Sequence, residues 1–165
     1  GVPIDAYGVG SSLIRGENVD AIRARGIELD ADISYGGFDF SASYAYADSR
    51  VRSSGLALAL DGLRPAQTPR HQGSATIGWQ GEKGTHLVVT GRYMSGQYED
   101  DLNSRRLDDA VTADTVIAIP LAGGFSMEAR AENITDTRVE ATISSSGVIE
   151  RATPRTFWLA LRYAR

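Results

Sequence analysis

The sequence predicts an all-β fold, in which about seven antiparallel strands form a segment of a larger transmembrane β-barrel. Three observations lead to this fold class. Apolar and polar side chains alternate along the chain, short and long connections follow each other in turn, and charged side chains avoid the apolar face. No segment shows the period of an amphipathic helix, and no apolar run approaches the ~20 residues that a membrane-spanning helix needs.

Composition excludes several classes of function. The chain has 165 residues, enough for one domain, and a net charge of −4, which gives no basic surface for nucleic acid. We therefore expect no nucleic-acid partner. The sequence contains no cysteine, which excludes disulfide bonds and thiolate metal sites. His71 and His86 lie far apart in the sequence without an acidic neighbour, so we expect no metal site, no cofactor and no catalytic centre.

The first two strands are predicted over residues 27–35 and 38–46. In the first, apolar side chains occupy every odd position, and acidic or serine side chains stand between them. The second places phenylalanine, alanine and tyrosine on one face. The Gly36-Gly37 pair between them fits a tight hairpin turn, because glycine adopts the positive φ angles that such turns require.

Five further strands are predicted from the same alternation: 75–79, 87–93, about Leu107 to Ile119, 125–131 and 157–163. Residues 1–18 show no clear period, and their glycines argue against an eighth strand there. The connections are short at 36–37, 81–84 and 120–124 but long at 47–70, 95–106 and 133–153. Outer-membrane barrels have this arrangement, with short periplasmic turns and long extracellular loops.

Charge separates the two faces of the predicted strands. The apolar face has no charged residue in the clearly alternating spans, whereas the opposite face has eight: Glu28, Asp30, Asp32, Asp39, Arg92, Glu128, Arg130 and Arg162. Such a contrast is typical of a wall with lipid on one side and water on the other. We interpret Arg92, Glu128, Arg130 and Arg162 as members of cross-strand ion pairs in a wet lumen, in preference to the lining of a solute path.

Aromatic residues on the apolar face gather at the strand ends. Those beside the short turns or the chain end are Tyr35, Phe38, Trp79, Phe125 and Tyr163, and those toward the long connections are Tyr46, Tyr93 and Phe157. Two aromatic girdles of this kind flank the lipid-facing band of outer-membrane barrels. The core of a soluble sandwich has no reason to sort its aromatic residues in this way.

The predicted strand number is odd, whereas single-chain bacterial barrels have an even number of strands. An open sheet would also leave two edges with unpaired backbone groups in hydrocarbon, which is not tolerated. We therefore expect residues 1–165 to be a C-terminal portion of a longer barrel, whose earlier strands lie elsewhere in the full-length protein.

Six segments, taken in order and spacing, match a known family: 18–28, 69–73, 91–93, 98–103, 131–136 and 154–163. They resemble the C-terminal part of a TonB-dependent outer-membrane receptor. The resemblance implies a barrel of the 22-stranded transporter type, closed around an N-terminal plug that these residues do not include. It also implies a non-enzymatic receptor in the bacterial outer membrane that takes up a scarce solute, such as a ferric siderophore, cobalamin or an oligosaccharide.

The resemblance further implies three partners. The barrel contacts outer-membrane lipid, and the inner-membrane TonB complex acts through the missing N-terminal plug. The last strand, with Phe157, Leu159, Leu161 and Tyr163 on its apolar face, resembles the signal that the barrel-assembly machinery recognises. Such signals usually end in an aromatic residue, whereas this chain has Arg165 in that position.

The long connections contain the candidate ligand contacts. Arginines suit an anionic ferric chelate, because guanidinium groups form charge-assisted hydrogen bonds with anions. The candidates are Arg50, Arg52, Arg64, Tyr98, Asp100, Asp101, Asn103, Arg105 and Arg106. The alternative interpretation of each is an ordinary solvated loop side chain.

Two other interpretations remain open from the sequence. A passive porin or an adhesin-type barrel would have similar strands but no plug, which the upstream sequence would reveal. A soluble β-sandwich binding module would enclose Phe38, Val89, Ile117 and Leu159 in one interior. An outer-membrane enzyme would need an acid–base constellation at one strand end, and the sequence shows none.

Overall fold

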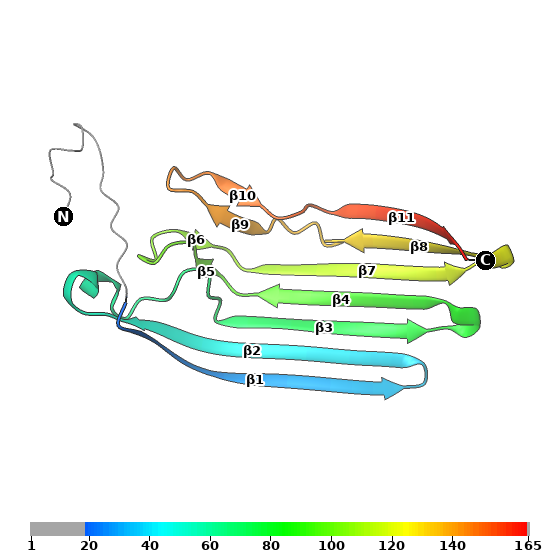
Figure 1. The fold of residues 1–165 in the computed structure, drawn as a ribbon, viewed down its shortest axis with the longest axis horizontal. Helices are drawn as coiled ribbons and strands as arrows, with labels where there is room; N and C mark the ends of the chain where they lie inside the picture. Colours follow the sequence, from blue (N-terminus) through cyan, green and yellow to red (C-terminus); the bar gives the residue numbers. More distant parts are fainter. Residues whose placement is uncertain (1–18, 165) are drawn as a thin grey trace.

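Seven antiparallel strands form a single open sheet in the computed structural model, which describes residues 19–164 (Figure 1). Their order across the sheet is β1-β2-β3-β4-β7-β8-β11. Their bounds are β1 (Ala21–Tyr35), β2 (Phe38–Arg52), β3 (His71–Gln80), β4 (His86–Met94), β7 (Ala110–Pro120), β8 (Phe125–Glu132) and β11 (Thr156–Tyr163). Two small hairpins complete the described strands: β5 (Gln97–Tyr98) with β6 (Arg106–Leu107), and β9 (Glu140–Ile143) with β10 (Ile149–Arg151).

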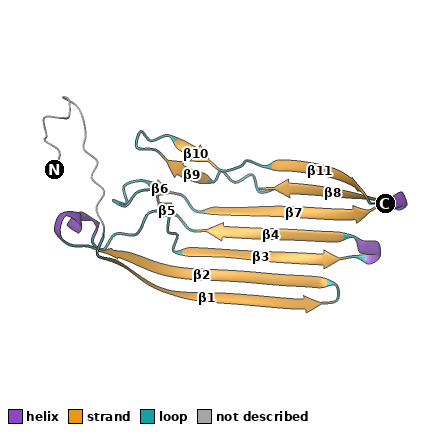
Figure 2. Ribbon diagram, in the orientation of Figure 1, coloured by secondary structure: helices purple, strands orange, loops and turns teal. Residues whose placement is uncertain are grey.

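The connections sort to the two ends of the sheet (Figure 2). One end carries the Gly36-Gly37 turn and two short 3-10 turns, η3 (Glu82–Gly84) and η4 (Ala122–Gly124). Gly36 and Gly37 have φ angles of 57° and 80°, which explains why glycine occupies this turn. The other end carries the small hairpins and η2 (Gly55–Leu60), which lies between β2 and β3. The predicted alternation of short turns and long loops is confirmed.

The register keeps one face continuous across all seven strands. From β1 to β11, a single row of paired residues contains Tyr35, Phe38, Trp79, Leu87, Ile117, Ala129 and Leu159. Every member of this row comes from the parity that the sequence predicts to be apolar. A slip of one residue would move all the apolar side chains of a strand to the other face. The register therefore confirms the predicted parity in every strand.

The apolar face is open rather than enclosed. Phe38, Val89 and Leu159 are 52%, 38% and 74% exposed, so they do not converge into an interior. In the described part of the chain, the buried hydrophobic residues are Val51, Leu107, Ala110 and Ala131, all toward the loop end. This distribution excludes a soluble sandwich, because the core of a sandwich forms between two inner sheet faces. An uncovered apolar face is what contact with lipid requires.

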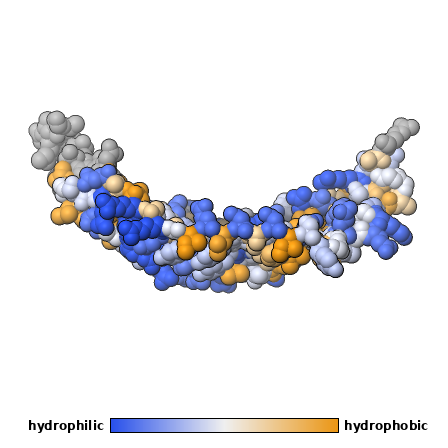
Figure 3. All heavy atoms as spheres, turned by 90° about the horizontal axis from the view of Figure 1, so that it is seen from below, coloured by the Kyte–Doolittle hydropathy of each residue, from blue (hydrophilic) through white to orange (hydrophobic). Residues whose placement is uncertain are grey.

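The sheet is a bowed layer when viewed from its β1 side, with hydrophilic and hydrophobic atoms side by side along this edge (Figure 3). Among the described strands, β1 and β11 each pair with one neighbour only. The sheet thus matches a fragment of a barrel wall and is not closed. No helix within residues 19–164 is long and apolar enough to cross a membrane.

Four strand boundaries differ from the sequence prediction by three or more residues. β1 begins at Ala21 instead of residue 27, and β3 begins at His71 instead of residue 75. β2 continues to Arg52, although its apolar alternation ends at Tyr46, because its backbone keeps pairing with β1 to the end of both strands. β7 begins at Ala110 instead of about Leu107, since Leu107 pairs with β5 in a separate hairpin. The question of a strand within residues 1–18 lies outside the described residues.

Candidate ligand-binding surface

The three long connections contact one another at the loop end of the sheet, and we call residues 53–70, 95–109 and 133–155 the loop layer. The backbone N–H of Gln67 donates to the carbonyl oxygen of Tyr98 at 2.7 Å, which joins the first loop to the second. The hydroxyl of Thr142 donates to the Glu99 carboxylate at 2.6 Å, which joins the second loop to the third. These contacts place residues from distant parts of the sequence on one surface.

Three of the predicted ligand contacts meet where the first two loops touch. The guanidinium carbon of Arg64 lies 5.9 Å from the centre of the Tyr98 ring, within the range of a cation–π interaction. Asn103 holds the backbone of Arg64 from both sides: its Oδ1 accepts the Arg64 N–H at 3.0 Å, and its Nδ2 donates to the Arg64 carbonyl oxygen at 2.8 Å. We call Arg64, Tyr98 and Asn103 the Arg64 cluster.

The Arg64 guanidinium lies in a positive field. Partial burial, followed by the charges of Arg70 and Arg50, lowers the pKa of the Arg64 guanidinium below its ordinary value. Arg64 nevertheless stays protonated at neutral pH, because arginine is not deprotonated in proteins. A nearby anion would offset the positive field, since an opposite charge favours the charged form of a group. The electrostatics of the Arg64 cluster therefore suit an anion.

Asp100 and Arg105 shape the second loop. The Asp100 carboxylate accepts the backbone N–H groups of Arg105 at 2.7 Å and of Ser104 at 3.0 Å. Partial burial acts to raise the pKa of Asp100, but the hydrogen bonds from Arg105 and Ser104 lower it overall from 3.8. The Arg105 side chain lies 3.8 Å from the same carboxylate. Asp101 and Arg106, by contrast, are exposed.

Arg50 and Arg52 lie on the last part of β2 and share the parity of the apolar face. Arg50 donates to the carbonyl oxygen of Gly62 at 3.1 Å and pairs with Asp48 at 3.3 Å. Arg52 lies 3.8 Å from Asp61. The predicted candidates therefore do not form one pocket, because the Arg64 cluster lies between two loops while these two arginines lie on a strand.

A concavity of about 530 Å³ opens on the polar face of the sheet. Its lining includes Glu28 and Asp30 from β1, Arg92 from β4, Thr112 from β7 and Val139 from the loop layer. The volume falls within the roughly 300–1,000 Å³ that is typical of ligand pockets. Sequence reasoning identified the inward charges but not the concavity, because the concavity depends on how the third loop reaches over the sheet.

Ion pairs connect the inward charges. Arg92 pairs with Asp114 on the neighbouring strand β7. The Glu128 carboxylate lies 3.3 Å from Arg162 on β11 and 2.6 Å from Arg130 on its own strand. Pairing across strands, as predicted, is thus confirmed for Arg92, Glu128 and Arg162, whereas Arg130 pairs within β8.

Asn133 anchors the base of the third loop, a role that sequence reasoning missed. It is 6% exposed. Its Nδ2 donates to the carbonyl oxygens of Thr137 at 2.9 Å and Thr153 at 3.4 Å, and its Oδ1 accepts the Thr137 N–H at 3.1 Å. Its backbone N–H donates to Asp114 at 2.8 Å. Asn133 therefore ties both ends of this loop together and connects them to the ion pair of Asp114.

The four predicted assembly-signal residues form one column on β11: Phe157, Leu159, Leu161 and Tyr163 are each at least 60% exposed. The Tyr163 ring lies 4.8 Å from the Phe125 ring, and the rings of Phe38 and Trp79 lie 6.5 Å apart. All four rings belong to the turn end of the sheet. Four of the five aromatic residues predicted for the girdle at this end thus form two ring pairs, and the fifth, Tyr35, lies opposite Phe38 in the register of β1 and β2.

His71 lies on the parity of the apolar face, where its ring contacts two tyrosines. Its Nδ1 is 2.8 Å from the Tyr44 hydroxyl, and its ring lies 5.0 Å from that of Tyr46. Within residues 19–164, no group of three or more histidine, aspartate or glutamate side chains is close enough to bind a metal ion.

A comparison with known protein families identifies the family to which this open sheet and its loop layer belong. The sequence profile described as "TonB dependent receptor-like, beta-barrel" matches residues 2–134. The chain belongs to this family. TonB-dependent receptors are transport proteins of the bacterial outer membrane and not enzymes, which also gives the location of this chain. No curated protein sequence matches the chain.

Solved TonB-dependent receptors share the fold of the sheet. The siderophore receptor PiuA from Acinetobacter baumannii is 16% identical with a TM-score of 0.74, and the match covers 86% of this chain and 22% of that one. The ferric yersiniabactin uptake receptor FyuA from Yersinia pestis is 17% identical with a TM-score of 0.75, covering 86% and 23%. The chain therefore spans less than a quarter of the length of these receptors.

Proposed function

We propose that residues 1–165 are the C-terminal portion of the barrel of a TonB-dependent receptor that actively imports a scarce solute across the outer membrane. The observation that supports this most strongly is the open seven-stranded sheet, whose apolar face runs unbroken from β1 to β11. Such a wall requires further strands of the same barrel at both edges, since backbone groups left unpaired in lipid cost several kcal/mol. A 22-stranded barrel with an N-terminal plug would supply them.

A ferric siderophore is the proposed class of solute. Two solved structures with the same fold are a siderophore receptor and a ferric yersiniabactin uptake receptor. In this chain, the positive field around the Arg64 cluster supports a negatively charged chelate. Cobalamin and oligosaccharides are the other solute classes of this proposal, and neither requires a cationic cluster.

Arg64 and Tyr98 are the proposed direct ligand contacts, because the guanidinium and the ring lie together between two loops. Asn103 and Arg105 are proposed to hold the loops in shape around them. Arg50 adds to the positive field at Arg64, and Arg52 lies two positions farther along β2. The concavity beside Glu28, Asp30 and Arg92 is the proposed route inward from this surface.

Three partners follow from this function. The apolar face contacts outer-membrane lipid. The barrel-assembly machinery recognises β11, with the exposed column of Phe157, Leu159, Leu161 and Tyr163 as its signal. The inner-membrane TonB complex acts on the N-terminal plug of the full-length receptor.

The experiment measures uptake of iron-labelled chelates by cells that express the full-length receptor. Uptake is expected to require TonB, and Arg64→Ala is expected to weaken the apparent affinity for an anionic chelate about tenfold or more. The reason is that a hydrogen bond to a charged group contributes ~1.5–3 kcal/mol. Arg138→Ala, which removes an exposed arginine from the third loop, is the matched control. Uptake that continues without TonB would instead indicate a passive porin.

A further inference from the structure

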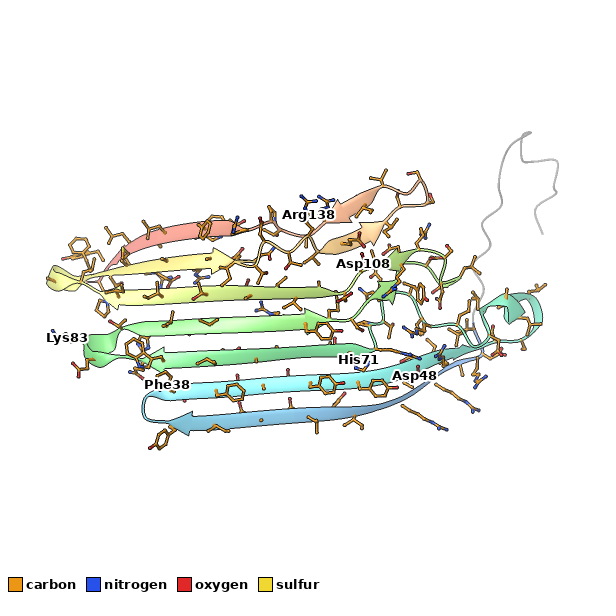
Figure 4. All side chains as sticks on the ribbon, turned by 180° about the vertical axis from the view of Figure 1, so that it is seen from behind. Phe38, Asp48, His71, Lys83, Asp108 and Arg138 are labelled. Carbon is orange, nitrogen blue, oxygen red and sulfur yellow. The ribbon has the colours of Figure 1, made fainter. Side chains whose placement is uncertain are left out.

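The paired extension of β1 and β2 carries four arginines on the outward parity. The two strands pair without a bulge over their whole length, so the parity of the apolar face continues past Ile27 and Tyr46. Beyond that pair, the outward positions are Arg25 and Arg23 on β1, and Asp48, Arg50 and Arg52 on β2. Figure 4 shows Phe38 and Asp48 at opposite ends of the sheet, with Asp48 toward the loops. We call Arg23, Arg25, Arg50 and Arg52 the outward arginine patch.

The patch lies just beyond the lipid-facing band. Strands rise ~3.3 Å per residue, which places Arg25 and Arg23 about 7 and 13 Å along β1 from Ile27. With a strand tilt of roughly 40°, these distances correspond to about 5 and 10 Å above the band. The headgroup layer extends about 5–8 Å beyond the hydrocarbon on each side of a bilayer. The patch therefore begins at the level of the lipid headgroups.

Within residues 19–164, carboxylates balance the charges of the patch only in part: Arg50 lies 3.3 Å from Asp48, and Arg52 lies 3.8 Å from Asp61. Arg23 lies directly opposite Arg50, and like charges in this position destabilise a sheet. Arg25 lies opposite Asp48, but the Asp48 carboxylate is already shared by Arg70 at 2.7 Å and Arg50 at 3.3 Å. An external anion beside Arg23 and Arg25 would relieve this repulsion.

The face on which the patch lies determines the kind of anion. The concavity proposed for the solute opens on the polar face, whereas the patch shares the parity that faces lipid. We propose that the outward arginine patch binds the phosphate groups of lipid headgroups in the outer leaflet. Arginine binds phosphate through two parallel hydrogen bonds, so its planar group fits this ligand better than a point charge does.

This inference rests on the proposed orientation of the barrel, with its loops outside the cell. Such binding would fix the depth of the β1–β2 edge in the membrane. The apolar side chains of this edge would contact the acyl chains of the outer leaflet, and the arginines would contact its headgroups. Each arginine near an anionic membrane surface is expected to strengthen binding about fivefold.

The test uses the full-length receptor, purified in detergent, with lipid A and dephosphorylated lipid A as probes. The Arg23→Gln/Arg25→Gln variant is expected to bind lipid A about 25-fold more weakly, at about fivefold per arginine, and to bind the dephosphorylated probe as the unchanged receptor does. The matched control is Arg151→Gln, which removes an exposed arginine of β10 and should leave lipid A binding unchanged. Titration followed by native mass spectrometry measures the affinities.

Unchanged lipid A binding by the Gln variant overturns the inference, provided that the variant migrates as a folded barrel in unheated gels. An equal loss with both probes also overturns it, because phosphate would then not be the group recognised. If the Gln variant does not assemble, Arg23→Lys/Arg25→Lys keeps the charge but not the planar fork. Weaker lipid A binding by this Lys variant, with unchanged binding of the dephosphorylated probe, supports phosphate recognition, and unchanged lipid A binding opposes it.

Uptake measurements separate this inference from the proposed function. TonB-dependent uptake of the ferric chelate should persist in the Gln variant, because Arg23 and Arg25 share the parity that faces lipid and are not among the proposed solute contacts. Loss of chelate binding with lipid A binding retained would assign the patch to the solute and overturn the lipid inference. Absence of uptake in the unchanged receptor, with phosphate-dependent lipid binding intact, would instead contradict the proposed function alone.

Discussion

Single buried polar residues hold the loop layer together. Asn133 is 6% exposed, and its side-chain amide bonds to residues near both ends of the third loop. Its φ angle of 49° lies in the left-handed region, which asparagine enters more readily than most residues other than glycine. Both the side chain and the backbone conformation therefore favour asparagine at this position.

Asn133→Ala is expected to destabilise the third loop by about 1–3 kcal/mol, because buried carbonyl groups lose their donor. Trypsin cleavage of the folded receptor at Arg138 and Arg151 measures the effect as faster cutting. Glycine adopts the positive φ angle but has no side-chain amide, so Asn133→Gly should recover only part of the stability that Asn133→Ala loses. Asp101→Ala, at an exposed position in the second loop, is the control. Full recovery with glycine would show that the amide hydrogen bonds contribute little.

Asp100 makes the second loop sensitive to acid. Hydrogen bonds lower the pKa of its carboxyl from 3.8 in the folded protein, so its stabilising contribution is present above that value and is lost as the pH falls through the lower, folded pKa. We expect pepsin to cleave residues 95–109 faster once the pH falls below about 4. Asp100→Asn should be cleaved readily at all acidic pH values. A transition that persists in this variant would assign the effect to another carboxyl group.

At the scale of the strands, the sequence is most informative where successive side chains face lipid and water in turn. In β11, Leu159 and Ala160 are neighbours in the chain but belong to opposite faces. Leu159 is 74% exposed on the apolar face, whereas Ala160 lies opposite Glu128 on β8. The parity of this strand could be predicted because lipid accepts no charge on one face and the lumen accepts charge on the other.

Leu159→Arg is expected to block membrane assembly, because an arginine near the bilayer midplane costs about 2–4 kcal/mol. Ala160→Arg should be mild, since the new side chain faces the Glu128 carboxylate on the neighbouring strand. The measurement is the fraction of full-length receptor that reaches the outer membrane and shows heat-modifiable migration. Equal effects of the two substitutions would contradict the assignment of the faces.

Elements beyond the lipid-facing band could not be predicted by the same means. β2 runs past Tyr46 because its backbone still pairs with β1, although its side chains no longer alternate between two solvents. The β5–β6 hairpin has two residues in each strand, too few for a periodic pattern, yet Leu107 within it is 1% exposed. Above the membrane, local packing rather than alternation decides where strands form.

The candidate site, too, could be predicted from the sequence only in part. The arginines and Tyr98 could be proposed as ligand contacts from their chemistry and their place in long connections. Their grouping could not, because Arg64 and Asn103 are 39 positions apart and meet only through two side-chain hydrogen bonds to one backbone. The separation of Arg50 from that cluster depends on the continuation of β2, which the residue pattern does not reveal.

At the scale of the whole molecule, the sheet is incomplete as a unit of folding. Its apolar face has no covering layer among the described residues, and β1 and β11 each have one paired edge. A closed barrel satisfies the backbone groups at both edges and gives the apolar face to lipid, so neither condition can be met by these strands alone. Stability therefore depends on the rest of the receptor and on the membrane together.

Residues 1–165 expressed alone are accordingly expected to aggregate in buffer without detergent. Large exposed apolar patches and unpaired strand edges both promote association between copies. Co-expression with the remaining part of the receptor should recover a heat-modifiable complex in the outer membrane, because the two parts then supply each other's edges. Size-exclusion chromatography and membrane fractionation measure the two outcomes. A stable monomer without detergent would mean that the apolar face is covered from within the chain, and the assignment of that face to lipid would then be wrong.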